Sequence, residues 1–158
     1  ANPEAHVLTT AQEIWEDTYG QVDILVATVG TGGTLCGTAR CLKAHNPQLL
    51  SIAVEPQESP LLSGGTASLH GIQGIGANFI PDNYDTTVVD RIMQVSTEQA
   101  MQTGRELSRH EGLITGISSG AAVHAALTYA LSPEAKSKTI VVVLPDTGER
   151  YLSTELYG

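Results

Sequence analysis

Aromatic and basic side chains are both scarce in this chain of 158 residues. It has one Trp, five Tyr and one Phe, so we expect a core of aliphatic side chains. Lys and Arg number 8 against 17 Asp and Glu, which gives a formal net charge of −9. Because nucleic acids and anionic membranes bind clustered basic side chains, this charge balance argues against both as partners.

Long apolar runs, paired cysteines and metal-ligand spacings are also missing. No apolar stretch approaches the ~18 residues that a membrane span needs. The two cysteines, Cys36 and Cys41, fall on different faces of one expected helix, which favours two reduced thiols and a cytoplasmic protein. The five histidines share no metal-ligand spacing with one another or with the cysteines, so we expect no metal site.

Apolar runs bounded by turn residues alternate with helical patterns along most of the chain. Strands are predicted at 23–29, 50–55, 91–95 and 139–144. Helices are predicted from the capping-box threonines Thr9 and Thr10 to about Asp17, at 34–45, from the Ser96 capping box to Glu111, and from the loop 116–120 to about Leu131. The alternation predicts a single α/β domain over 1–158, with a mostly parallel sheet and helices on both faces.

Three segments read as loops or surface. Residues 1–6 have no initiator Met and read as the middle of a loop, as in a processed chain, a fragment or a chain cut at a domain edge. Residues 56–82 are rich in Gly, Ser and Pro, and a loop of this length is usually functional or disordered. Asp82, Asp85 and Asp90 cluster in a polar turn region that reads as solvated surface.

The segment Gly30-Thr31-Gly32-Gly33-Thr34 joins a buried strand to a helix. Glycines at such a turn let backbone N–H groups converge, and the helix N-terminus adds partial positive charge. The threonine hydroxyls add further donors. We therefore predict a site for a phosphate-bearing ligand, with a tight turn that binds nothing as the alternative.

A dinucleotide site of the Rossmann type is a second alternative. Gly30 and Gly32 begin its glycine fingerprint, and Glu55 ends the next strand, where a ribose-binding acid would stand. However, Leu35 follows Gly32-Gly33-Thr34 where a third glycine is needed, and a helix precedes the first strand.

The segment Gly116-Ile117-Ser118-Ser119-Gly120 opens an Ala-rich helix. Taken alone it reads as a helix cap, although its serines also suit a hydroxyl presented to a ligand. It is not a nucleophile elbow, because no strand leads into it and His124 lies within the same helix. Ligands bind at the carboxyl ends of strands in open α/β sheets, so the loops at 30–34, 116–120 and 145–151 are expected to line one crevice.

Five motifs together resemble the C-terminal half of the cysteine synthases (O-acetylserine sulfhydrylases), a family of fold-type II pyridoxal-phosphate enzymes with cystathionine β-synthase as a close relative. The resemblance covers essentially the whole chain, and its motifs are Val29-Gly30-Thr31-Gly32-Gly33-Thr34, Val54-Glu55-Pro56, Gly71-Ile72-Gln73-Gly74-Ile75-Gly76-Ala77, Gly116-Ile117-Ser118-Ser119-Gly120-Ala121-Ala122 and Gly148-Glu149-Arg150-Tyr151-Leu152-Ser153. Departures include Gly71, where the family commonly has a basic residue, and Asn78, where it usually has glycine.

The resemblance implies a role for each of these loops. Gly30, Thr31, Gly32, Gly33 and Thr34 would hold the 5′-phosphate of pyridoxal phosphate, and Ser118 would hydrogen-bond its pyridine nitrogen, with Asp146 and Thr147 near the ring. Gln73, Gly74 and Gly76 would form a loop on the substrate side that closes on binding.

The resemblance also implies a reaction and partners. The acetate of O-acetylserine would be replaced by sulfide to give L-cysteine, in a homodimer that can bind the C-terminal tail of serine acetyltransferase. Cystathionine β-synthase chemistry is the alternative reaction.

The family's Schiff-base lysine is not recognised in this chain. Lys43 ends a helix, Lys136 and Lys138 lie in a polar turn, and none matches the family's lysine motif. We therefore expect no catalytic residue within 1–158, an N-terminal half that is absent from this chain, and no β-replacement activity from the chain alone. A non-catalytic phosphate-binding module left by truncation is the alternative.

Overall fold

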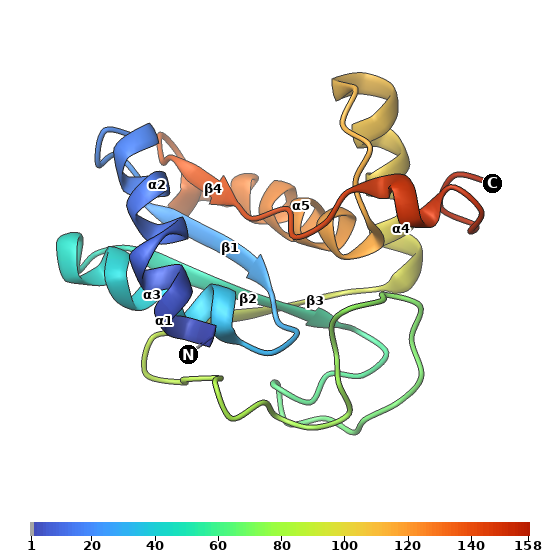
Figure 1. Cartoon of the computed structure of the whole chain (residues 1–158), viewed down its shortest axis with the longest axis horizontal. Helices are drawn as coiled ribbons and strands as arrows, with labels where there is room; N and C mark the ends of the chain where they lie inside the picture. The colour runs from blue at the N-terminus through green and yellow to red at the C-terminus, as the bar shows by residue number, and fades with distance from the viewer. Residues whose placement is uncertain (1) are drawn as a thin grey trace.

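The computed structural model describes residues 2–158, which form one four-stranded parallel sheet with strand order β3-β2-β1-β4 (Figure 1). The strands are β1 (Ile24–Thr28), β2 (Leu50–Pro56), β3 (Arg91–Val95) and β4 (Ile140–Val142). In the central pair, Ile24 lies opposite Leu50 and Thr28 opposite Val54. The predicted α/β class with a parallel sheet is confirmed.

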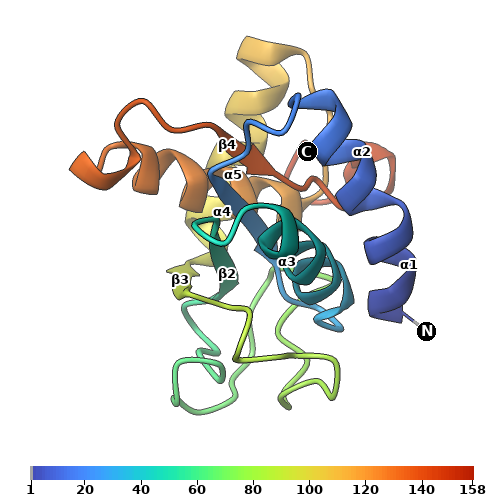
Figure 2. The ribbon, with the colours of Figure 1, turned by 90° about the vertical axis from the view of Figure 1, so that its left-hand side faces the viewer.

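Helices cover both faces of this sheet. One face carries α1 (Asn2–Leu8), α2 (Thr10–Asp17) and α3 (Gly33–His45), which Figure 2 shows together on one side. The other carries α4 (Thr97–Glu106), its π-helical extension η1 (Leu107–Glu111) and α5 (Ile117–Ala130). Two short 3₁₀ turns, η2 (Pro133–Ala135) and η3 (Gly148–Tyr151), flank β4.

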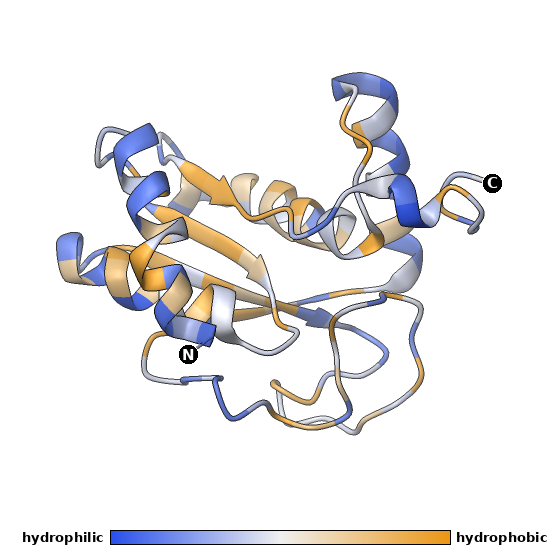
Figure 3. Cartoon of the chain, in the orientation of Figure 1, coloured by the Kyte–Doolittle hydropathy of each residue, from blue (hydrophilic) through white to orange (hydrophobic). Residues whose placement is uncertain are grey.

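Alternate residues of the central strand enter two separate cores. Ile24 and Val26 pack in the cluster under α5, whereas Leu25 and Ala27 pack in the cluster under α3. A strand buried on both faces has to be apolar throughout, and Figure 3 shows β1 and β4 as largely apolar. The central strand is therefore buried by a helical layer on each face of the sheet.

The beginning of the chain differs from the prediction. Residues 2–8 form helix α1 rather than a loop, because a proline in the first turn of a helix loses no hydrogen bond and α1 is packed against α3. Thr9 makes no capping bond to the helix that follows. Its hydroxyl donates to the carbonyl of Ala5 at 2.8 Å, so α1 runs almost directly into α2.

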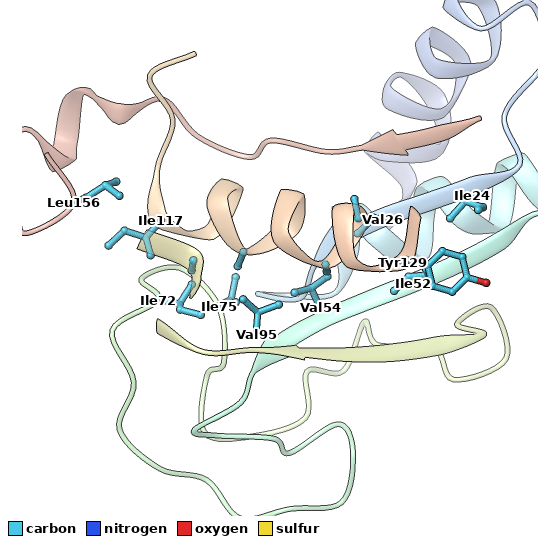
Figure 4. Close-up of a cluster of buried hydrophobic side chains, with 14 of the residues drawn as sticks. Ile24, Val26, Ile52, Val54, Ile72, Ile75, Val95, Ile117, Tyr129 and Leu156 are labelled. Carbon is cyan, nitrogen blue, oxygen red and sulfur yellow. The ribbon is translucent and has the colours of Figure 1, made fainter. Parts of the chain in front are cut away.

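The long segment between β2 and β3 contains no helix or strand from 57 to 90, yet it is tied to the sheet at several points. The buried carboxylate of Glu55 accepts hydrogen bonds from the backbone N–H of Leu62 at 2.7 Å and of Ser63 at 3.1 Å. Ile72 and Ile75 enter the core beside Ile117 (Figure 4). The loop is therefore an ordered part of the molecule.

Two aspartates of the predicted surface cluster also form ion pairs with α3. Asp85 accepts from Arg40 at 3.0 Å and Asp90 from Lys43 at 2.6 Å. The pKa of Asp85 is lowered mainly by hydrogen bonds from the side chain and backbone of Thr87. At Asp90 burial opposes ionisation, but the bonds from Lys43 and from Ser51 outweigh it and lower the pKa. Asp82 is exposed, as predicted.

Two further features concern the helices. Both bonds of the capping box predicted at Ser96 are present, with Gln99 N donating to Ser96 Oγ at 3.2 Å and Ser96 N donating to Gln99 Oε1 at 3.0 Å. Within residues 2–158, none of the helices has the length and apolar character needed to span a bilayer.

Candidate functional site

The turn after β1 presents backbone donors that have no acceptor. Gly32 is the N-cap of α3 and has φ +81°, a conformation that side chains rarely adopt. Within the part of the chain that the structure describes, no acceptor is found for the backbone N–H of Gly30, Thr31, Gly32, Thr34 or Leu35. Such a set of N–H groups at the start of a 13-residue helix is a site for an anion.

The glycines of this turn are required by close neighbours. A Cβ at Gly30 would lie 2.5 Å from the carbonyl oxygen of Gly74, and one at Gly32 would lie 3.0 Å from the backbone nitrogen of Tyr84. Gly76 N also donates to the carbonyl of Val29 at 3.4 Å. The predicted phosphate loop and the predicted substrate-side loop are therefore packed together.

These two loops share a pocket of about 550 Å³. Its lining residues are Gly30, Thr31, Gly74, Ile75, Ala77, Phe79, Pro81, Asp82 and Asn83. Gln73 is exposed at its edge. Sequence reasoning did not select Phe79, which is 65% exposed, although a lone aromatic side chain in a Gly-rich loop was a usable signal.

A second group of hydroxyls surrounds Asp146. Its Oδ1 accepts from Ser119 Oγ at 3.1 Å and from Ser118 Oγ at 3.4 Å, and its Oδ2 accepts from Tyr151 Oη at 2.6 Å. Burial, followed by the bond to Asp146, raises the pKa of Tyr151 to about 12. A Cβ at Gly116 would lie 2.1 Å from the Asp146 carboxylate, which therefore sits over the start of α5.

The predicted loops lie at one edge of the sheet. The loop 30–34 follows β1 and the loop 145–151 follows β4, while α5 begins there and is joined to the latter by a bridge between Thr115 and Thr147. Ser118 is 3% exposed and does not line the 550 Å³ pocket. The two loops and the start of α5 therefore share one edge of the sheet, where Ser118 is buried.

All three lysines lie at the opposite edge. Lys43 is in the last turn of α3, which runs back from the phosphate loop, and it is paired with Asp90. Lys136 and Lys138 precede β4, and Lys138 lies 3.6 Å from Asp23, just before β1. No lysine side chain of this chain therefore approaches the glycine loop.

The geometry also bears on the dinucleotide alternative, on the two cysteines and on metal binding. Glu55 is bound to the loop that follows it, so it does not present a free carboxylate to a ribose, as a dinucleotide site requires. Cys36 and Cys41 are free thiols, and burial raises the pKa of Cys36. Among residues 2–158 no three metal-binding side chains come together.

Comparisons with known proteins agree with this geometry. A cysteine synthase of Buchnera aphidicola (subsp. Acyrthosiphon pisum) is 50% identical over 166 aligned positions, covering 100% of this chain and 53% of the relative. O-acetyl serine sulfhydrylase isoform 3 of Entamoeba histolytica is 51% identical with a TM-score of 0.97, covering 99% of this chain and 46% of that structure. An O-acetylserine dependent cystathionine beta-synthase of Helicobacter pylori is 39% identical with a TM-score of 0.92, covering 99% of this chain and 51% of that structure.

The chain spans about half the length of the curated relatives it matches. A family model described as "Pyridoxal-phosphate dependent enzyme" matches residues 1–146, which include the glycine loop, the substrate-side loop and the start of α5. With its glycine loop at the carboxyl edge of a parallel sheet, the chain belongs to the family of pyridoxal-phosphate dependent enzymes.

Proposed function

We propose that this chain forms the cofactor-phosphate half of a cysteine synthase, which replaces the acetate of O-acetylserine with sulfide to give L-cysteine. The observation that carries the proposal is the turn at 30–34, whose backbone N–H groups lack acceptors and whose Gly30 and Thr31 line the same pocket as Gly74. Identity of about half the residues to cysteine synthases supports the choice of reaction.

The loop fits the phosphate of the cofactor. Its donors are main-chain N–H groups and the hydroxyls of Thr31 and Thr34, at the positive end of α3. No basic side chain takes part, and none is needed, because converging N–H groups bind a phosphate without one. Gly30 and Gly32 let the backbone of Gly74 and of Tyr84 pack against the loop and so hold it in place.

Ser118 is proposed as the partner of the pyridine nitrogen. When bound, the cofactor supplies an electron sink for a carbanion at the substrate α-carbon. A neutral hydroxyl holds the ring nitrogen less strongly protonated than a carboxylate would, which favours β-replacement over transamination. Ser119 donates to Asp146 at 3.1 Å, whereas the bond from Ser118 is 3.4 Å long, so Ser118 would turn its proton from Asp146 to the ring nitrogen when the cofactor binds.

The loop around Gln73 is proposed to close over the substrate. Gly74 has φ +88° and Gly76 has φ +64°, a left-handed conformation that glycine enters and leaves at little cost. Because the Gly74 carbonyl is packed against Gly30 and Gly76 is packed on His70, closure would change the first of these contacts.

The reactive lysine is proposed to lie outside these residues, since the lysines of this chain are at the far edge of the sheet. Exposed apolar side chains on the long loop, with Leu69 at 92% and Phe79 at 65%, support a covering segment or subunit. A homodimer, binding of a serine acetyltransferase tail and a cytoplasmic location belong to the same proposal; the two free thiols support the last.

The test is made on the protein in its natural length. It is reduced with borohydride, its intact mass is measured under denaturing conditions, and the peptide that carries the pyridoxyl group is located. We expect an adduct on a lysine outside residues 1–158, and cysteine formation from O-acetylserine and sulfide before reduction. No adduct and no cysteine would leave a non-catalytic phosphate-binding module.

The alternative reaction is separated by substrate. Cystathionine formation from homocysteine, with O-acetylserine or serine as the other substrate, is measured beside cysteine formation at equal enzyme concentration. A higher kcat/KM for homocysteine than for sulfide would show that the cystathionine β-synthase reaction is the correct assignment and cysteine synthesis is not.

A further inference from the structure

Helix α1 lies against the start of α3 in both ribbon views (Figures 1 and 2). Two α3 residues permit this contact. A Cβ at Gly33 would lie 1.9 Å from Asn2 Oδ1, and one at Gly37 would lie 2.2 Å from the carbonyl oxygen of Pro3. These glycines are one helical turn apart, so they form a groove that seats α1 on the anion loop.

Two side chains from one face of α1 reach the threonine hydroxyls of the loop. Asn2 Nδ2 donates to Thr31 Oγ1 at 3.2 Å. His6 Nε2 lies 3.1 Å from Thr34 Oγ1, and its Nδ1 lies 2.9 Å from Thr10 Oγ1. Because Asn2 and His6 are four residues apart, they project from the same side of the helix.

We propose that Asn2 and His6 are positioning residues that direct the hydroxyl protons of Thr31 and Thr34 toward a bound phosphate. This inference rests on the proposed function of the loop. At Thr31 the direction is fixed by chemistry, because an amide N–H only donates. Thr31 Oγ1 also accepts a long bond of 3.4 Å from Gly33 N. With its lone pairs occupied, its proton remains for the anion.

At Thr34 the direction depends on the imidazole tautomer. With the proton on Nε2, His6 donates to Thr34 and accepts from Thr10, so the Thr34 proton is free to reach the phosphate. With the proton on Nδ1, the Thr34 hydroxyl donates to His6 Nε2, and a lone pair of Thr34 Oγ1 then faces the anion. A phosphate in the loop therefore selects the Nε2–H tautomer.

A matched pair of variants tests this inference in the natural-length protein. His6→Gln carries an amide N–H at about the reach of Nε2, whereas His6→Asn carries one at about the reach of Nδ1 and keeps only the contact to Thr10. We expect His6→Asn to weaken pyridoxal 5′-phosphate binding about tenfold and His6→Gln to stay within about threefold of the parent protein. Equilibrium dialysis measures both.

Pyridoxal, which lacks the phosphate, is the control ligand. We expect its affinity to be the same in the parent protein and in both variants. Equal losses for both ligands, equal losses in both variants, or no loss in either would overturn the inference. A parent protein that binds neither ligand would instead overturn the proposed function, so the two failures are distinguishable.

Two further readouts separate positioning from folding. In protein labelled with ¹⁵N-histidine, the ring nitrogens of His6 should report the Nε2–H tautomer when the phosphate is bound. Thr34→Val should remove the effect of His6→Asn, so the double variant binds no more weakly than Thr34→Val alone. Asn2→Ala and Thr31→Val should be coupled in the same way. Additive losses in both pairs would contradict the proposal.

Discussion

The conformation of the anion loop depends on single glycines, because their neighbours leave no room for a Cβ. Gly30, Gly32 and Gly33 each have a neighbour where a Cβ would stand, but the neighbours differ in kind. At Gly30 and Gly32 the neighbour is backbone, which cannot move aside. At Gly33 it is the flexible end of Asn2, so a side chain there would displace the contact to Thr31.

Gly32→Ala should abolish tight cofactor binding. Both Gly32, at φ +81°, and Gly64, at φ +84°, have a conformation that disfavours alanine, so each substitution is expected to cost about 1 kcal/mol of folding free energy. Only Gly32 is crowded, by Tyr84 N at 3.0 Å, while Gly64 has nothing within 4 Å. Urea unfolding should show a stability loss in both variants that is larger in Gly32→Ala, and pyridoxal 5′-phosphate titration should show a loss of affinity in Gly32→Ala alone.

Tyr151 should make the stability depend on alkaline pH. Burial and the bond to Asp146 raise its pKa to about 12, above the value of about 10 expected in the unfolded chain. The stabilisation is therefore complete below about pH 10 and is lost as the pH rises through about 12. Tyr151→Phe should reduce the decline in unfolding free energy between pH 9 and 11 by roughly 1 kcal/mol.

The control for this pH effect is Tyr19→Phe, at a side chain that is 91% exposed. It should leave the decline unchanged. Part of the decline remains in Tyr151→Phe, because burial also raises the pKa of Tyr84 to about 12 and raises the pKa of Tyr129 and of Cys36. An identical decline in the parent protein and in Tyr151→Phe would contradict the role given to the Asp146 bond.

At the scale of elements, one threonine and one serine show how capping depends on context. Ser96→Ala should cost about 1 kcal/mol, because it removes the acceptor for Gln99 N at the start of α4. Thr9→Ala should cost clearly less, since its hydroxyl caps nothing and donates to the Ala5 carbonyl. Urea unfolding of the two variants compares them; a larger loss at Thr9 would count against this account.

Most elements were predictable because their signals are local. The strands β1, β2 and β3, the helix α3 and the capping box of α4 all follow from apolar runs, glycines and caps that stand next to one another in the sequence. The helix α1 was missed because its support is not local. It depends on Gly33 and Gly37, some thirty residues later, whose grooves are invisible until the chain is folded.

The candidate site was predictable to the same extent. The loops were found because glycine-rich turns at strand ends are typical of anion sites, and the parallel sheet brings them to one edge. The contacts of Asp85 with Arg40, and of His6 with Thr34, were not predictable, because each joins side chains 45 and 28 residues apart. Asp85 and Asp90 lie at the surface, as predicted, but their pairing with Arg40 and Lys43 was missed for this reason.

The departures from the family pattern acquire physical reasons in the structure. Asn78 has φ +42°, and asparagine tolerates this left-handed region better than most residues, which accounts for its place where glycine is usual. A Cβ at Gly71 would lie 2.5 Å from Thr97 Cγ2. A basic side chain at 71 therefore requires Thr97 to move, so the two positions are coupled.

At the scale of the whole molecule, the two edges of the sheet differ in chemistry. The carboxyl edge holds the glycine loop, the buried serines and Asp146, and the amino edge holds the lysines and their carboxylate partners. The sheet therefore separates the proposed anion loop from all three lysine side chains.

Replacing Lys43, Lys136 and Lys138 together by arginine should leave the borohydride-reduced adduct of the natural-length protein unchanged. Arginine keeps the charges that face Asp90 and Asp23 but does not form a Schiff base with an aldehyde. The adduct yield is read by intact mass, with far-UV circular dichroism as the check on folding. A folded triple variant without adduct would show that one of these lysines is reactive.

The close approach of Gly74 to Gly30 has a consequence for how such a site is inherited. A binding site made of side chains fails when mutation takes atoms away. A site made of main-chain N–H groups survives such losses and fails when atoms are added. The substitutions that such a site tolerates during evolution are therefore limited mainly at the few positions where the chain has no room for one more carbon.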